Sequence, residues 1–184
     1  MIACSCKSIV MSEHSNLGPI DPHLRGIPAY GAIEEFETAF KEIALDPKRV
    51  RVWAPILGQY RPTFLGQCQN AITVSKAFVR QQLAKGMFHG DPNARQKAAK
   101  ITNALSSYRV NKAHDRHIHM TECKRPGLKI ERLEDDQDLQ DLVLTVHHCY
   151  MNALMNGPSF KIIENLNGIA FVKQQIQIAM QARQ

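Results

Sequence analysis

The chain concentrates side chains capable of chemistry between residues 114 and 123. This stretch contains His114, Asp115, His117, His119 and Cys123. Imidazole and thiolate groups are the usual ligands of zinc, so a metal site is one interpretation. A catalytic carboxylate at Asp115 is a second interpretation, and a polar loop that leads into a helix and a strand is a third.

The spacing of these residues argues against a metal site. The pattern His-x2-His-x-His-x3-Cys is not a recurrent zinc spacing, and no Cys-x2-Cys pair accompanies it. His147, His148 and Cys149 hold further donor atoms, but adjacent residues on a helix point in different directions. The sequence therefore predicts no metal and no cofactor, and a His/Cys metal-binding protein is the least favoured alternative.

Composition narrows the class of protein. The chain has 184 residues, 44% hydrophobic and 22% charged, which is typical of a globular protein with one core. Five scattered cysteines and the lack of a signal-peptide pattern predict reduced thiols in the cytoplasm. The net charge of +6 is dispersed without interleaved aromatic residues, so nucleic-acid binding is not expected. No run of eighteen apolar residues occurs, so no membrane segment is predicted.

Apolar periodicity predicts a mostly helical chain with a few short strands, a minimal α/β pattern. Helices are expected over 32–45, 50–57, about 62–85, 92–105 and 139–154, and strands over 8–11 and 128–133. In the first helix, the expected buried face consists of Ile33, Phe36, Phe40, Ile43 and Ala44.

A rigid loop begins at Leu17 and contains Gly18, Pro19, Asp21 and Pro22. The prolines restrict the residues before them to extended backbone, and such a loop is suited to binding a peptide or presenting a side chain. A plain structural connection explains the same residues equally well. No serine in the chain has the flanking glycines of a nucleophile turn between a strand and a helix.

Several segments together resemble the serine dehydrogenase proteinase family of Clp-protease-like serine peptidases. They are Leu17-Gly18-Pro19-Ile20-Asp21-Pro22, His114-Asp115-Arg116 with Gly127-Leu128, the helix 139–148, and Lys161-Ile162-Ile163-Glu164-Asn165. The resemblance extends over nearly the whole chain. It implies one Clp/crotonase-like α/β domain over residues 1–184, mostly its helical C-terminal portion.

The resemblance also implies an activity, namely serine-type hydrolysis of a peptide or protein substrate by a homo-oligomer without a cofactor. In this family a Ser-Gly-Gly-Thr-like turn carries the nucleophile, and its expected place is a few residues before Met1. The chain also opens without a helix start signal. We therefore expect an N-terminally incomplete domain that a serine-directed fluorophosphonate probe does not label.

Site residues can be carried over position by position. Asp115 is the expected orienting carboxylate, because an Asp-Arg pair precedes a short helix and Gly-Leu in Clp-type peptidases. The histidine base of the family aligns with Ile20, which cannot take a proton, so Asp21 or His23 is expected to substitute, with His114 as a further possible base. Leu17, Gly18, Pro19 and Ile20 are expected to bind substrate. The alternative to a peptidase is a non-catalytic helical module for interaction and assembly.

Overall fold

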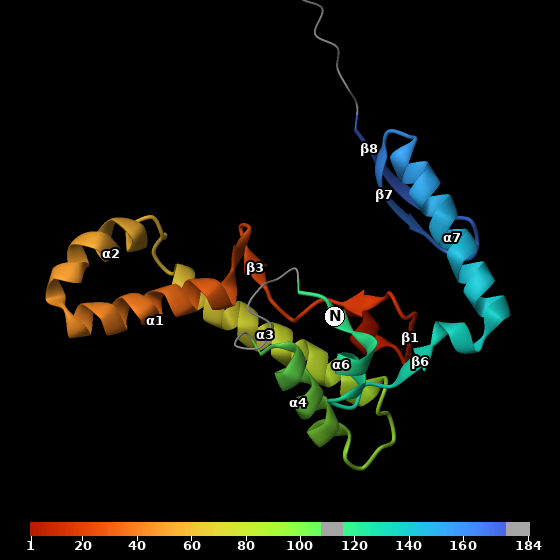
Figure 1. The fold of residues 1–184 in the computed structure, drawn as a ribbon, viewed down its shortest axis with the longest axis horizontal. Coiled ribbons are helices and arrows are strands. Elements are labelled where there is room, and N and C mark those ends of the chain that lie inside the picture. Colours follow the sequence, from red (N-terminus) through yellow and green to blue (C-terminus); the bar gives the residue numbers. More distant parts are fainter. Residues whose placement is uncertain (108–115, 176–184) are drawn as a thin grey trace, which may run out of the picture. The chain divides into compact units, whose positions relative to one another are not determined.

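The computed structural model describes residues 1–107 and 116–175 (Figure 1). It contains both helices and strands, which confirms the α/β pattern in general. The chain divides into two compact units, Met1–Arg132 and Leu133–Gln184. The expectation of one Clp-like domain over residues 1–184 stays a prediction.

The first unit holds most of the secondary structure and most of the buried residues. Its elements are η1 (Ile2–Ser5), β1 (Ile9–Met11), β2 (Asn16–Leu17), β3 (His23–Leu24), β4 (Ile27–Pro28), α1 (Ala29–Leu45), η2 (Pro47–Arg49), α2 (Val50–Leu57), α3 (Phe64–Lys85), α4 (Ala94–Leu105), β5 (Ile118–His119), α6 (Met120–Lys124) and β6 (Ile130–Arg132).

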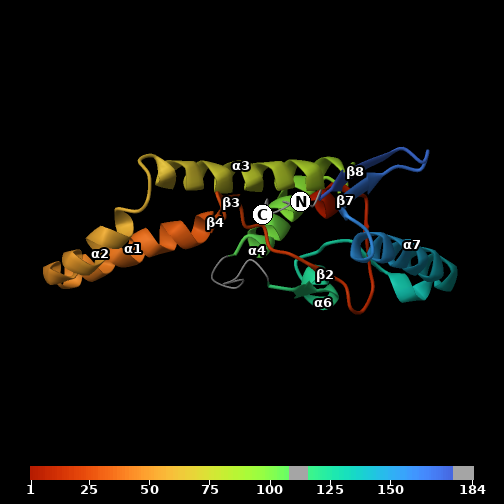
Figure 2. The same cartoon turned by 90° about the horizontal axis from the view of Figure 1, so that it is seen from above.

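Helix α3 is the element around which the first unit packs. It contacts α1 along one part of its length and α4 along another (Figure 2). Val79 and Leu83 of α3 and Ile101 and Leu105 of α4 are buried in one hydrophobic cluster. These residues recur at helical spacing, so α3 and α4 each bury one apolar face.

The predicted buried face of α1 is wrong at Phe40, whereas Ile33 and Phe36 are half-buried and pack against neighbouring residues. Phe40 is 78% exposed, whereas Ala29, Ala32 and Ala39 are the buried residues of this helix. The distance between packed helices depends on the side chains at their contact, and alanines allow a close approach. Periodicity revealed an apolar stripe in α1, but the smaller alanines form the face that is buried.

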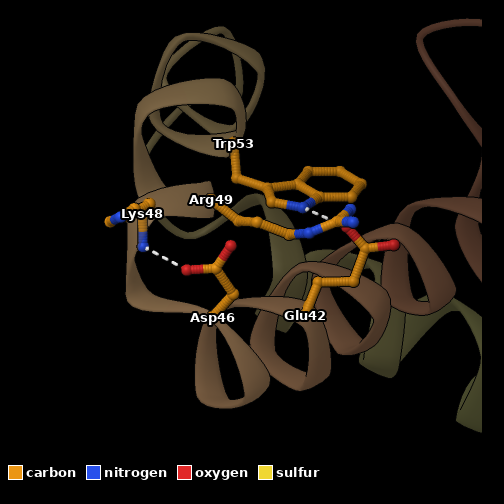
Figure 3. Close-up of polar contacts among 5 residues, drawn as sticks. All are labelled: Glu42, Asp46, Lys48, Arg49 and Trp53. Atoms are coloured by element: carbon orange, nitrogen blue, oxygen red, sulfur yellow. Dashed lines mark hydrogen bonds and ion pairs between the residues drawn. The ribbon is translucent and has the colours of Figure 1, made fainter.

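Polar contacts hold α2 against the end of α1 (Figure 3). Oε2 of Glu42 accepts hydrogen bonds from Nη1 of Arg49 at 2.8 Å and from Nε1 of Trp53 at 2.9 Å. The Asp46 carboxylate accepts from the backbone N–H of Lys48 at 3.0 Å and caps η2. The α1–α2 hairpin is therefore joined by charged groups at the surface.

The strands of the first unit form three separate pairs. β1 pairs with β6 in parallel, with Ile9 opposite Ile130. β2 and β5 are antiparallel. β3 and β4 form a hairpin whose turn residues, Arg25 and Gly26, have φ values of 55° and 84°. Two consecutive positive φ angles match the twist of the flanking strands, which explains the tight turn.

The second unit consists of η3 (Leu133–Asp135), α7 (Gln137–Met155) and the hairpin of β7 (Ser159–Glu164) and β8 (Ala170–Gln174). Asp136 caps α7 by accepting a hydrogen bond from the backbone N–H of Leu139 at 2.9 Å. α7 packs against β7, yet no side chain of α7, β7 or β8 is buried in the described structure.

Among residues 1–107 and 116–175, no helix is both long enough and apolar enough to cross a lipid bilayer.

Candidate functional site

Asp21 and His23 form a carboxylate–imidazole pair. Oδ2 of Asp21 lies 3.3 Å from Nε2 of His23. The side chain of Asp21 is 7% exposed, whereas that of His23 is 31% exposed. A buried carboxylate beside an accessible imidazole fixes the orientation and the tautomer of the ring, which is the arrangement that a general base needs.

Backbone hydrogen bonds hold this pair in place from both sides. The N–H of Ile20 donates to the carbonyl of Leu105 at 2.9 Å, and the N–H of Ala29 donates to the carbonyl of Pro22 at 2.9 Å. The first bond ties the loop to the end of α4, and the second ties it to the start of α1. His23 is thus presented by a fixed hairpin rather than by a free loop.

The pairing of β2 with β5 joins the two segments from which the sequence predicted a site. Leu17 lies opposite Ile118, and Asn16 lies opposite His119. The loop that contains Asp21 and His23 therefore begins beside the strand that follows Asp115 in the sequence. Asp115 and His114 are themselves outside the described residues, and their roles stay predictions.

The short helix after β5 occurs where the sequence placed it. Nη2 of Arg116 donates to Oε1 of Glu122 at 2.6 Å, and Glu122 also caps the backbone N–H of His119. Gly127 then adopts a φ of 113°, a conformation that glycine accommodates, and Leu128 is buried. The prediction that a short helix is followed by Gly127 and Leu128 is confirmed as local structure.

The predicted substrate-binding residues 17–20 differ in their accessibility. Gly18 is exposed and has open space where a side chain would point, and Leu17 and Pro19 are half-buried. The side chain of Ile20 is 6% exposed and belongs to the hydrophobic core. In this segment, Gly18 offers the most accessible backbone, and its role in binding stays a prediction.

The candidate metal ligands have other roles in the described structure. Cys123 is fully buried and donates to the carbonyl of Ile118, and burial raises the pKa of its thiol to about 11. His147 and His148 have ring centroids 5.8 Å apart on α7. Within residues 1–107 and 116–175, no three His, Cys, Asp or Glu side chains gather as a metal-binding group.

A cavity beside the β3–β4 hairpin was not predicted from the sequence. Its volume is about 290 Å³, and its lining residues are Arg25, Ile27, Gln59, Tyr60, Arg61, Pro62, Phe64 and Gln67. The hairpin has no standard turn signal in the sequence, because its strands are two residues long and its turn is Arg25-Gly26 rather than Asn-Gly or Asp-Gly. The approach of the 59–62 segment depends on tertiary packing, for which the sequence has no local signal.

Comparison of the chain with protein families, with characterised proteins and with solved structures gave no match. The assignment to the serine dehydrogenase proteinase family therefore rests on the sequence segments quoted above.

Proposed function

We propose that this chain is a serine-peptidase-like protein of the Clp/crotonase-like class, in which His23 is the general base and Asp21 orients it. The contact of 3.3 Å between Oδ2 of Asp21 and Nε2 of His23 carries the proposal. Asp21 and His23 were the expected substitutes for the family histidine, and the structure places these two side chains against each other.

The chemistry follows from the tautomer of the ring. When Nε2–H of His23 points to Asp21, Nδ1 is the basic nitrogen. Nδ1 takes the proton of the attacking serine hydroxyl, the serine oxygen forms an ester with the substrate acyl group, and the proton passes to the leaving amine. Water then repeats these steps and releases the acid. That serine is the nucleophile which the family resemblance implies, and Asp115 remains a second candidate carboxylate.

Two strand pairings support the proposed fold class. β1 and β6 are parallel, and a parallel pair requires a crossover connection, here one that contains α1, α3 and α4. The β2–β5 pair brings the Asp21–His23 loop beside the segment that follows Asp115. Both features agree with a domain in which catalytic residues far apart in the sequence meet at the ends of strands.

A hydrolysis assay with matched variants tests the proposal. Fluorogenic peptides and a fluorophosphonate probe are applied to the full-length gene product. His23→Gln is expected to lower hydrolysis by about 10²–10⁴-fold, since general base catalysis contributes roughly this factor. Asp21→Asn is expected to lower it as well, while His89→Gln, an exposed histidine of the same unit, leaves it unchanged. Equal rates in the His23→Gln variant and the parent would overturn the proposal.

A second candidate function is assembly with further copies of the chain. The second unit supports it. Its described helix and hairpin expose many large apolar side chains: Leu142, Val146, Met155, Phe160, Ile163, Leu166, Ile169 and Phe171 are each more than half exposed. A helix with one hairpin and so little buried apolar surface gains stability when a partner covers that surface.

Light scattering during size-exclusion chromatography tests the assembly module. The 184-residue chain is expected to elute as an oligomer, and the double substitution Leu142→Glu with Phe171→Glu is expected to dissociate it. Leu45→Glu, at an apolar residue of α1 that is 87% exposed, serves as the control. A monomeric parent protein contradicts this second function without bearing on the peptidase chemistry.

A further inference from the structure

We propose that the cavity between the β3–β4 hairpin and the α2–α3 connection binds the C-terminal residue of a peptide, with its carboxylate held by Arg25 and Arg61. The inference names the substrate class of the site that contains His23, and its choice of a peptide rests on the proposed function. The cavity, its charge and its aromatic wall are observations that stand apart from that function.

The charge of the cavity favours a carboxylate. Arg25 and Arg61 both line it, and none of its lining residues is acidic. Neither arginine forms an ion pair with another described residue. A guanidinium group matches a carboxylate with two parallel hydrogen bonds, and such charge-assisted bonds are stronger than neutral ones. Two arginines that line one cavity therefore provide donors for a planar anion.

The wall of the cavity favours an apolar side chain attached to that anion. The rings of Tyr60 and Phe64 stack with their centroids 5.3 Å apart and an interplanar angle of 26°. Ile27 and Pro62 extend this apolar surface. Gln59 and Gln67 supply amide donors and acceptors, which are the groups that a peptide backbone requires. Guanidinium, amide and aromatic groups together match a terminal amino-acid residue with an apolar side chain.

The size of the cavity limits what enters it. Pockets for drug-sized ligands have volumes of about 300–1,000 Å³, and this cavity, at about 290 Å³, lies at the lower end. One residue fits such a volume, and the rest of the peptide extends outside. The open side of the cavity then leads the preceding residues along the surface of the first unit.

The aromatic wall is fixed before any ligand binds. The Tyr60 hydroxyl donates a hydrogen bond to Glu35, and this bond raises the pKa of Tyr60 to about 12. Phe36 packs on the other side of Tyr60, with ring centroids 5.2 Å apart. Phe64 is buried with Cys68, which anchors the start of α3. A preformed wall reduces the ordering cost of binding.

The hairpin connects this cavity to the candidate base. Arg25 follows His23 by two residues and begins the turn that closes the β3–β4 hairpin. A peptide whose last residue occupies the cavity thus has its preceding peptide bonds within a few residues of the imidazole. The arrangement is that of a subsite which selects free C-termini and directs the bonds near them to His23.

Fluorescence anisotropy with short labelled peptides tests this site. One peptide ends in leucine with a free carboxylate, and a second has the same sequence with a C-terminal amide. The free carboxylate is expected to bind at least about tenfold more tightly, because hydrogen bonds to charged groups contribute about 1.5–3 kcal/mol. Equal affinity for the two peptides would overturn the inference. A third, amidated peptide ends in glutamate; if it binds as tightly as the free acid, the assignment to a terminal carboxylate is wrong.

Matched arginine variants locate the binding. Arg25→Gln and Arg61→Gln are each expected to remove the preference for the free carboxylate, whereas Arg51→Gln, an exposed arginine of α2, keeps it. Circular dichroism confirms that each variant is folded. A preference that survives in both Arg25→Gln and Arg61→Gln contradicts the site. Selective binding without hydrolysis supports this site and contradicts the peptidase; hydrolysis without selectivity for free carboxylates does the reverse.

Discussion

Trp53 of α2 donates a hydrogen bond from its indole Nε1 to Oε2 of Glu42 in α1, at 2.9 Å. The same carboxylate oxygen accepts from Arg49 at 2.8 Å. These hydrogen bonds hold the pKa of Glu42 below its usual range. The bond from Trp53 has the larger effect, and the bond from Arg49 has the next largest. One exposed carboxylate therefore joins the two helices of the hairpin, and the contact depends on pH.

The first prediction concerns acid. Because the pKa of Glu42 is lowered in the folded state, the stability that it contributes is present above about pH 4.3, the usual glutamate value, and is lost as the pH falls through the lowered value. Trp53 is the only tryptophan, so its fluorescence reports this contact. We expect a fluorescence transition below about pH 4.3 that Glu42→Gln removes and Glu34→Gln retains. The same transition in Glu42→Gln would contradict the assignment.

The second prediction concerns alkali. The hydrogen bond to Glu35 raises the pKa of Tyr60 to about 12, so the proton is held more tightly in the folded state. Its contribution to stability is present below about pH 10, the usual tyrosine pKa, and is lost as the pH rises through about 12. Tyrosine ionisation is followed by ultraviolet absorbance as the pH is raised. The step at the highest pH is expected to disappear in Tyr60→Phe. The control is Tyr150→Phe, which removes another tyrosine whose pKa is raised. This variant is expected to keep the highest step.

The third prediction concerns thiol reactivity. Cys4, Cys68 and Cys123 are buried, and burial raises the pKa of each thiol. The thiolate is the reactive form, so these residues are expected to resist iodoacetamide in the native protein. Cys6 and Cys149 are exposed and are expected to react. Peptide mass spectrometry after native labelling measures both sets, and rapid labelling of Cys123 would contradict the core packing.

The fourth prediction concerns the core. Ile101 of α4 is fully buried in the main hydrophobic cluster. Ile101→Ala is expected to lower the free energy of unfolding by about 2–5 kcal/mol, since it removes buried methyl groups and leaves a cavity. Leu45→Ala changes a residue that is 87% exposed, and its effect is expected to stay within about 0.5 kcal/mol. Urea unfolding followed by circular dichroism compares the two, and equal effects would refute the packing of α4.

Helix positions could be predicted well from the sequence because their signals are local. The expected helix over 50–57 is α2 itself, and the helix expected to end near Lys85 ends there, before Gly86. Gly86 has a further reason to be glycine, since a Cβ there would lie 2.9 Å from the backbone oxygen of Ser5. That close approach is tertiary, and the sequence contains no local sign of it.

The site was predictable only in part. The loop containing Asp21 and His23 was identified from its prolines and from the family resemblance, but the pairing of these two side chains depends on how α1 and α4 hold the loop. The cavity between Arg25 and Arg61 depends on the packing of Tyr60 between Phe36 and Phe64. Such tertiary contacts join residues at irregular separations in the sequence. No local sequence pattern therefore predicts them.

The parallel pairing of Ile9 with Ile130 also sets an order of events during synthesis. Strand β1 leaves the ribosome before its partner β6, which follows more than a hundred residues later. At about 5–20 residues per second, the edge of β1 waits on the order of ten seconds for its partner. Through that interval the apolar residues Ile9 and Met11, which end up buried, are open to other nascent chains. We therefore expect the yield of folded protein to depend on translation speed and on the supply of chaperones.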